Sequence, residues 1–127
     1  LPAAEARRLI GPAMLLGVSV ATPDEARRAL SDGADYVSVA PVFLTPTKPD
    51  AELAVGLEGV ARIREATGDA PVLAIGGVSA GNAGAVVAAG SDGVAVVSAV
   101  MSAPDPAAAA ADLRRAVDAA LVQRRPP

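Results

Sequence analysis

Four short apolar runs recur along the chain, and each is bounded by Gly, Pro or Asp. They are Leu15–Val18, Tyr36–Ala40, Val72–Ile75 and Gly93–Val97. Continuous apolar runs of this length are typical of strands that are buried on both faces of a parallel sheet. The pattern therefore predicts four parallel strands.

Helical patterns alternate with these runs. Thr22-Pro23-Asp24-Glu25 places a capping hydroxyl, a first-turn proline and two acids at the start of a helix that Gly33 ends. Ser79 is predicted to cap a matching helix after the third strand. Further helices are expected at Ala3–Ile10, Gly56–Thr67 and Asp105–Val122.

An internal repeat with an offset of 57 residues relates the two parts of this pattern. Leu15–Ser19 aligns with Val72–Gly76, and Gly33–Asp35 aligns with Gly90–Asp92, without a gap. Strands that alternate with helices form a parallel α/β sheet. Four such strands correspond to half of a (β/α)8 TIM barrel, whose full length is typically about 250 residues.

The predicted domain covers residues 1–122: strands 5 to 8 of such a barrel with their helices, preceded by helix 4. Residues 123–127 are predicted to form a disordered tail. Half a barrel leaves its two outer strands as open edges, which natural proteins rarely leave uncovered. We therefore expect a fragment of a longer protein, or a chain that pairs with another. An open four-stranded sheet is the alternative architecture.

Composition narrows the function. The chain contains no cysteine and no histidine, and its net charge is −3. These features exclude thiol chemistry, histidine-based triads and typical zinc sites, and they argue against nucleic acid or an anionic membrane as a partner. No apolar run is long enough to span a bilayer. We expect a cytoplasmic protein.

The basic residues are almost all arginines. Ten of the eleven are arginine, they lie on predicted helices or the tail, and we interpret them as solvated faces. Lys48, the single lysine, lies instead in a long loop beside Thr45, Pro46 and Thr47. Two hydroxyls and an ammonium between prolines favour an anion site. The alternative is a surface loop whose lysine only keeps it solvated.

A second candidate site follows the last two predicted strands. Gly77 comes directly after one strand, and Val97 and Ser98 come at the end of the next. Loops in this position commonly bind phosphate in barrels, because backbone N–H groups and helix dipoles face the anion there. Ser19 ends the first strand at the matching height, and a ligand contact and an ordinary polar strand end are equally compatible with it.

Three other polar residues are interpreted as structural. Asp35 and Asp92 lie in turns that enter strands, at the edge opposite the expected site, so we exclude them as metal ligands. Asn82 is expected to stabilise a helix start rather than to contact a ligand.

Five segments resemble the thiamine-phosphate synthase family, in order and at that family's spacing. They are Gly17–Ser19, Gly33–Val37, Ala40–Lys48, Ala74–Val78 and Gly93–Ala99. The resemblance places the chain in the C-terminal half of the barrel. It implies the joining of hydroxymethylpyrimidine diphosphate to thiazole phosphate, with release of pyrophosphate. A dissociative reaction of this kind requires charge neutralisation and alignment more than a general base.

The resemblance also implies roles for individual residues. Lys48 would hold the diphosphate as the catalytic residue, and Ser19 would contact the pyrimidine diphosphate. Thr45, Pro46 and Thr47 would line the thiazole-phosphate pocket. The backbones of Gly77, Val97 and Ser98 would bind the phosphate of the thiazole.

The chain departs from the family pattern in two ways. The family's diphosphate motif, its pyrimidine pocket and both aspartates that bind Mg²⁺ belong to an N-terminal half that is not in this sequence. We therefore expect the chain alone to be inactive and to need that half or a partner chain. Ala21 stands where related thiazole tautomerases have a histidine, which argues against tautomerase chemistry.

Two other functions remain as alternatives. One is a phosphate-binding half-barrel without catalytic activity that dimerises through its open edges. The other is a different phosphate-binding barrel enzyme, such as an isomerase or epimerase, which the Thr-Pro-Thr-Lys loop disfavours.

Overall fold

The computed structural model describes residues 1–44 and 54–124 of the chain. In chain order, the elements are α1 (Ala3–Ile10), β1 (Gly17–Val20), α2 (Pro23–Ser31), β2 (Tyr36–Val39), α3 (Gly56–Thr67), β3 (Val72–Ile75), α4 (Ala83–Ala89), β4 (Gly93–Ala95), α5 (Ser98–Met101) and α6 (Pro106–Arg124). Among these helices, none is both long and apolar enough to cross a membrane.

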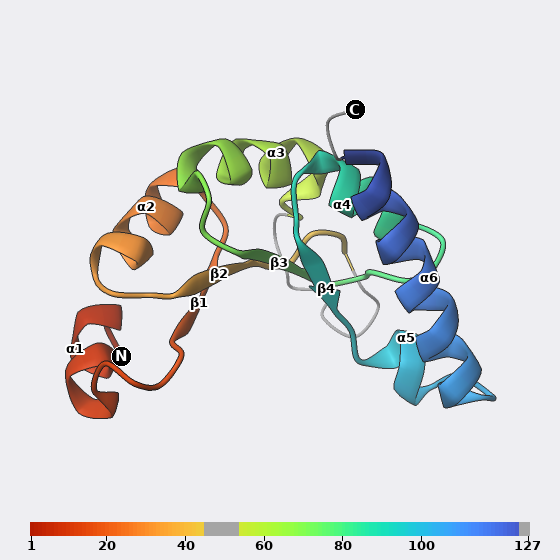
Figure 1. Cartoon of the computed structure of the whole chain (residues 1–127), viewed down its shortest axis with the longest axis horizontal. Coiled ribbons are helices and arrows are strands. Elements are labelled where there is room, and N and C mark those ends of the chain that lie inside the picture. The colour runs from red at the N-terminus through yellow and green to blue at the C-terminus, as the bar shows by residue number, and fades with distance from the viewer. Residues whose placement is uncertain (45–53, 125–127) are drawn as a thin grey trace.

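The four strands form one parallel sheet in the order β1-β2-β3-β4. Helices α2, α3 and α4 lie along the outer side of the arc that the strands make (Figure 1). The predicted α/β class with four parallel strands and helices is therefore confirmed. Because all four strands are parallel, their carboxyl ends meet at one edge of the sheet, where the predicted site lies.

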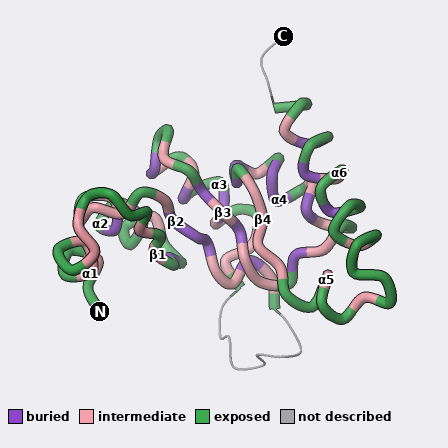
Figure 2. Tube along the Cα trace, turned by 60° about the horizontal axis from the view of Figure 1, so that its bottom comes forward, coloured by how far each residue is buried: buried purple, intermediate pink, exposed green. Residues whose placement is uncertain are grey.

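The core lies between the sheet and the outer helices. Val37, Val39 and Val72 are fully buried on the strands, and Val60 and Ile63 of α3 pack in the same apolar cluster. Figure 2 shows the buried positions along the strands and on the inward sides of the helices. Alternate strand residues point to opposite faces, so this valine-rich pattern attaches one face of the sheet firmly to the helices.

The opposite face of the sheet is less covered. Ser19 is exposed, and Leu73 and Ile75 are half-buried. In a closed barrel, residues with this orientation fill the interior in layers. The register places Ser19 opposite Ser38 and Ser38 opposite Leu73, so these three residues form one row across β1, β2 and β3 on this face.

Several predicted boundaries differ from the structure. The second strand ends at Val39 rather than Ala40, and the fourth ends at Ala95 rather than Val97. The first strand begins at Gly17 rather than Leu15, and Leu15 is 78% exposed. The reason is a one-residue gap in the repeat before its strands: Asp35 and Asp92 are 57 residues apart, whereas Leu16 and Val72, whose N–H groups they accept, are 56 apart. The final helix continues to Arg124, two residues into the predicted tail; residues 125–127 lie outside the described part.

An arginine–aspartate clamp closes each repeat at the edge where strands begin. The guanidinium of Arg7 donates to the carbonyl of Gly33 at 2.8 Å and to Asp35 at 2.6 Å, and the Asp35 carboxylate also accepts the N–H of Leu16 at 2.7 Å. Arg7 thereby attaches α1 to the turn that enters β2. Because side chains and backbone groups both take part, the strength of this clamp depends on hydrogen-bond geometry as well as on charge.

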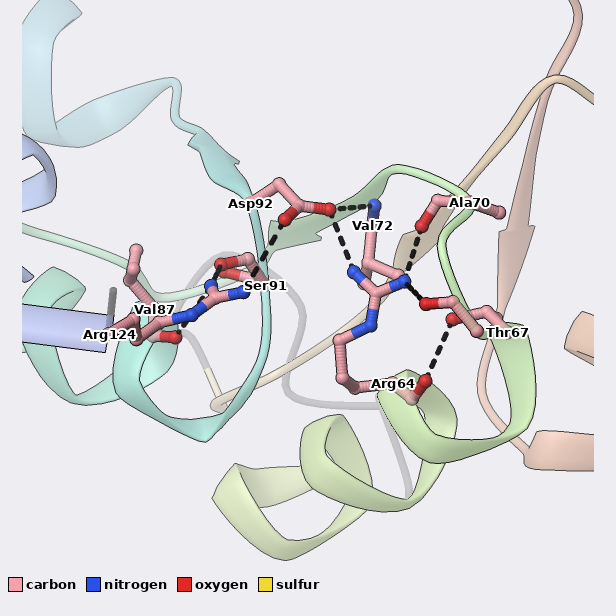
Figure 3. Close-up of polar contacts among 9 residues, drawn as sticks. Arg64, Thr67, Ala70, Val72, Val87, Ser91, Asp92 and Arg124 are labelled. Atoms are coloured by element: carbon pink, nitrogen blue, oxygen red, sulfur yellow. Dashed lines mark hydrogen bonds and ion pairs between the residues drawn. The ribbon is translucent and has the colours of Figure 1, made fainter. Parts of the chain in front are cut away.

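The second clamp repeats the first one at the offset of the sequence repeat (Figure 3). Arg64 donates to Asp92 at 2.8 Å, and Asp92 accepts the N–H of Val72 at 2.8 Å. Arg124 connects α6 to this clamp, with its guanidinium 2.5 Å from the carbonyl oxygen of Ser91 and 3.6 Å from the Asp92 carboxylate. Asp35 and Asp92 therefore lie at the strand-entry edge and bind arginines, as their structural interpretation requires.

Three of the arginines that we interpreted as solvated faces are thus turned inward. The side chains of Arg7 and Arg64 are only 21% and 19% exposed. Arginine can be half-buried in this way because its five N–H donors are satisfied by carbonyls and a carboxylate together. The interpretation holds for Arg27 and Arg114, which form exposed pairs on their own helices.

The Asp35 clamp predicts a pH dependence of stability. The N–H of Leu16, and after it the Arg7 guanidinium, lower the pKa of Asp35 below its ordinary value. A carboxylate with a lowered pKa stabilises the folded state above the unfolded pKa, and this contribution is lost as the pH falls through the folded pKa. Asp35→Asn should therefore lower the Tm at pH 7, and the difference from the parent should shrink below about pH 4. Thermal melts from pH 7 to pH 2 test this, and a constant difference would contradict it.

Candidate functional site

The turn after β3 is built from two glycines in the left-handed region. The φ angles are +109° at Gly76 and +66° at Gly77, where residues with a Cβ are strained. Two consecutive residues of this kind turn the chain sharply away from the strand. Gly77 is exposed at the carboxyl edge of the sheet. Its backbone is therefore accessible to a ligand at the predicted place.

The same turn is in close contact with the segment that follows β2. Val42 donates its N–H to the carbonyl of Ile75 at 2.9 Å, and Phe43 donates to the carbonyl of Gly76 at 3.0 Å. A Cβ on Gly77 would lie 2.8 Å from the Cβ of Phe43, and one on Gly76 would lie 2.9 Å from the Cα of Pro41. Steric space as well as backbone conformation thus requires glycine at both positions.

The second part of the site follows β4, which is the neighbour of β3 in the sheet. Val97 is 73% exposed, and Ser98 begins the four-residue helix α5. The carbonyl of Val97 accepts the N–H of Met101 at 2.8 Å, and this bond forms the first turn of α5. The first N–H groups of a helical turn have no partner within it. The Val97-Ser98 backbone therefore presents donors on the same edge as the Gly76-Gly77 turn.

One part of the sequence reasoning about this site is wrong. Ser79 does not cap α4, which begins at Ala83 after Asn82. The helix starts six residues after Gly77, so the expected helix dipole does not act at that glycine. The donors at Gly77 come from the turn itself.

Asn82 lies at the start of α4, as predicted, but its side chain acts on the turn. Its Oδ1 accepts the N–H of Ser79 at 2.9 Å, and its Nδ2 donates to the carbonyl of Gly77 at 2.9 Å. Residue type alone does not predict this role of Asn82, nor the close contact of Phe43 with Gly77. An asparagine a few residues after paired glycines is a usable signal, because its side chain can replace turn hydrogen bonds.

The other predicted residues are placed only in part. Ser19 is exposed on β1, two strands away from β3, so its side chain belongs to the same edge but not to the Gly77 turn. Thr45, Pro46, Thr47 and Lys48 lie outside the described residues.

The two ends of the segment that carries those four residues are held together. The N–H of Val55 donates to the carbonyl of Pro41 at 2.8 Å, and that of Gly56 donates to the carbonyl of Val42 at 2.9 Å. Because Val42 is also bonded to the end of β3, the base of this segment lies beside the Gly76-Gly77 turn.

The described part of the site offers backbone donors and hydroxyls rather than acids or bases. Across residues 1–44 and 54–124, no three His, Cys, Asp or Glu side chains gather as a metal site would require. Asp35 and Asp92 bind arginines at the opposite edge of the sheet. These residues do not fit a Mg²⁺ site, because hard cations take several oxygen ligands around one point.

Comparison with known proteins agrees with this geometry. Residues 1–100 match the thiamine monophosphate synthase family. The chain is 52% identical to the thiamine-phosphate synthase of Roseiflexus sp. (strain RS-1), over 98% of this chain and 52% of that protein. It is 53% identical to that of Moorella thermoacetica, over 92% of this chain and 55% of that protein.

A solved structure extends the likeness to three dimensions. The thiamine phosphate pyrophosphorylase from Pyrococcus furiosus superimposes with a TM-score of 0.84 at 41% identity, over 95% of this chain and 56% of that one. The chain thus spans about half the length of the relatives that it matches. The family model, the relatives and the fold agree, and the chain belongs to the thiamine monophosphate synthase family.

Proposed function

We propose that this chain supplies the thiazole-phosphate and pyrophosphate half of a thiamine-phosphate synthase site. The observation that carries the proposal is the Gly76-Gly77 turn. It is exposed at the carboxyl edge, left-handed at both residues and hydrogen-bonded to the base of the segment that contains Lys48. Successive backbone N–H groups in a turn of this kind can bind anions without any side chain. A neighbouring cation would bind a second, more highly charged group.

In the reaction, pyrophosphate would leave first, and the thiazole would then capture the pyrimidine carbocation. The bond between the pyrimidine methylene carbon and the diphosphate oxygen breaks, and its electrons leave with pyrophosphate. The thiazole nitrogen then donates its lone pair to the pyrimidine carbocation, which forms thiamine phosphate. No proton has to move in these steps, and this agrees with a chain that lacks histidine and cysteine.

The residues of this chain would align the two substrates and neutralise their negative charge. The Gly77, Val97 and Ser98 backbones would hold the thiazole's phosphate, and Thr45, Pro46 and Thr47 would line its pocket. Lys48 would neutralise the charge that develops on the departing diphosphate. Interactions that strengthen as charge develops lower the barrier most effectively.

The rest of the site would come from the other half of the barrel. Pairing β1 and β4 with further strands would close the sheet and cover its inner face. That half would contribute the pyrimidine pocket and the aspartates that bind Mg²⁺, because the described carboxylates of this chain do not fit the ion. The chain alone would be inactive, and the complete enzyme would work in the cytoplasm.

A second candidate is a phosphate-binding half-barrel that dimerises. The open edges of β1 and β4 favour it, since each of these strands has one neighbour in the sheet of the described residues. Light scattering on this chain distinguishes the two proposals. A stable dimer without synthase activity favours the half-barrel, whereas activity that appears only with the N-terminal half of a relative favours the synthase.

Lys48→Ala in the complete enzyme tests the synthase proposal. We expect turnover to fall at least tenfold, or by about 1.4 kcal/mol of transition-state stabilisation, because a cation beside the leaving group is lost. Steady-state release of pyrophosphate measures it. Arg62→Ala is the matched control, because it removes an exposed cation of α3 that only approaches Glu58 at 3.6 Å. Unchanged turnover in Lys48→Ala would refute the assignment of this residue.

A further inference from the structure

We propose that Asn82 is a positioning residue for thiazole-phosphate binding, and this inference rests on the proposed function. Its side chain fixes the orientation of the peptide between Gly77 and Val78. Through that peptide it determines whether the backbone donors of the turn point together toward the phosphate.

The hydrogen bonds of Asn82 are unusual for its position. It is the residue that precedes α4, yet its side chain makes no capping bond to that helix. Both of its polar atoms instead reach back, to the carbonyl of Gly77 and to the N–H of Ser79, each at 2.9 Å. The bond to the N–H of Ser79 resembles one half of a capping box, since the carbonyl of Ser79 accepts the N–H of Ala83 at 2.8 Å. The bond to the carbonyl of Gly77 has no such role at a helix start.

The two peptide planes on either side of the Gly77 Cα are each held by one hydrogen bond from outside the turn. The carbonyl of Gly76 accepts from the N–H of Phe43 at 3.0 Å, which orients the plane that contains the N–H of Gly77. The carbonyl of Gly77 accepts from Asn82, which orients the plane that contains the N–H of Val78. A peptide is planar, so holding its carbonyl also aims its N–H.

Because residue 77 is a glycine, the bond from Asn82 is needed to hold the Gly77-Val78 peptide. A glycine in the left-handed region has many accessible conformations, so its neighbouring planes are free to rotate unless something holds them. Phe43 holds one plane only. Removal of the Asn82 side chain would leave the Gly77-Val78 peptide with more freedom, and binding of an anion would then require ordering it.

The first repeat lacks the bond that orients the Gly77-Val78 peptide. Glu25 is the equivalent of Asn82, and its carboxylate also reaches back, to accept the N–H of Ala21 at 3.1 Å, but a carboxylate cannot donate to a carbonyl as Asn82 does. Two residues separate β1 from α2, and the Thr22 hydroxyl there caps the helix directly, accepting the N–H of Glu25 at 3.1 Å. Seven residues separate β3 from α4. Ser79 takes the position that Thr22 has in the repeat, but its N–H is bound by Asn82 instead. The second repeat therefore extends the loop and adds a side chain that shapes it.

The test is Asn82→Ser in the complete enzyme. Serine is a good residue before a helix but is too short to reach the carbonyl of Gly77. We expect the Kd for thiazole phosphate, measured by calorimetry, to rise about tenfold, the upper range for one hydrogen bond. The KM for the pyrimidine diphosphate should change by less than about twofold, because that substrate does not contact this turn in the proposal.

Thr67→Val is the matched control. It removes a side-chain hydrogen bond to the backbone at the opposite edge of the sheet, from Thr67 to the carbonyl of Arg64 at 3.1 Å, without changing the size of the side chain. It should lower the Tm to a similar extent and leave the Kd for thiazole phosphate unchanged. An equal loss of affinity in both variants, or none in Asn82→Ser, would overturn the positioning role.

Amide hydrogen exchange in the unliganded enzyme separates this inference from the proposed function. Exchange at Gly77–Ser79 should accelerate in Asn82→Ser and stay unchanged in Thr67→Val. If the parent enzyme does not bind thiazole phosphate, the proposed function fails. In that case, unchanged exchange at Gly77–Ser79 would also refute the bracing by Asn82.

Discussion

Gly90→Ala is expected to lower the free energy of unfolding by about 3 kcal/mol. Gly90 has a φ of +139°. Its added Cβ would lie 2.6 Å from the Cβ and 2.7 Å from the Cγ of Arg64. Those atoms cannot move away cheaply, because the guanidinium of Arg64 is bound to Asp92, Gly68 and Ala70. The destabilisation from backbone strain at residue 90 would therefore add to the destabilisation from loss of the second clamp.

Two other glycines provide graded controls for urea unfolding. Gly33→Ala affects the equivalent position of the first clamp, but its Cβ would be 3.1 Å from the Cγ of Arg7, so the cost should be smaller. Gly84→Ala lies in α4 with nothing within 4 Å of its Cβ and should stabilise by about 0.5–1 kcal/mol. If Gly90→Ala unfolds at the same urea concentration as the parent, the clamp does not depend on close packing of Arg64 over this glycine.

The repeat is the part of the fold that the sequence predicts best. The apolar runs and Gly-x-Asp turns give an offset of 57 residues. The same offset relates the two arginine–aspartate clamps, Arg7 with Asp35 and Arg64 with Asp92. The offset fails by one residue at the strands. Leu15 is apolar but precedes the strand, and periodicity alone cannot distinguish an exposed leucine before a strand from a buried one within it.

The arginines show why the burial of charged residues cannot be predicted from the sequence alone. Arg7 and Arg8 are adjacent and have the same propensity, yet only Arg7 points at the turn before β2. Which of the two faces inward depends on the angle at which α1 packs, a tertiary property. A pair of arginines on a helix is therefore compatible with both a solvated face and a clamp.

The edge of the sheet that carries the candidate residues is predictable, but the shape of the turn there is not. Parallel strands place Gly77, Val97 and Ser98 on one edge, and the sequence locates them there. The long loop before α4, the contact of Gly77 with Phe43 and the reach of Asn82 all depend on where the chain leaves the strand. Ser79 is a residue type that often caps helices, but α4 begins at Ala83, so residue type alone does not determine where this helix starts.

Gly77→Val in the complete enzyme is expected to lower kcat/KM for thiazole phosphate by at least about 100-fold, or about 2.7 kcal/mol. A β-branched residue is strained at a φ of +66°. Its Cβ would be 2.8 Å from the Cβ of Phe43 and 3.3 Å from the carbonyl oxygen of Leu44. The turn must therefore open, and its N–H groups would no longer converge on the phosphate.

Gly81→Ala is the control for this prediction, because it changes the same loop without strain. Gly81 has no left-handed φ, and its Cβ would contact only the Ser79 hydroxyl at 3.8 Å. We expect kcat/KM within about twofold of the parent. Steady-state kinetics with each substrate varied in turn gives the comparison. If Gly77→Val loses efficiency equally for both substrates, the turn supports the whole site. If it loses none, the phosphate binds elsewhere. A loss for thiazole phosphate that exceeds the loss for the pyrimidine diphosphate assigns the phosphate to this turn, because only a local contact distinguishes two substrates of one active site.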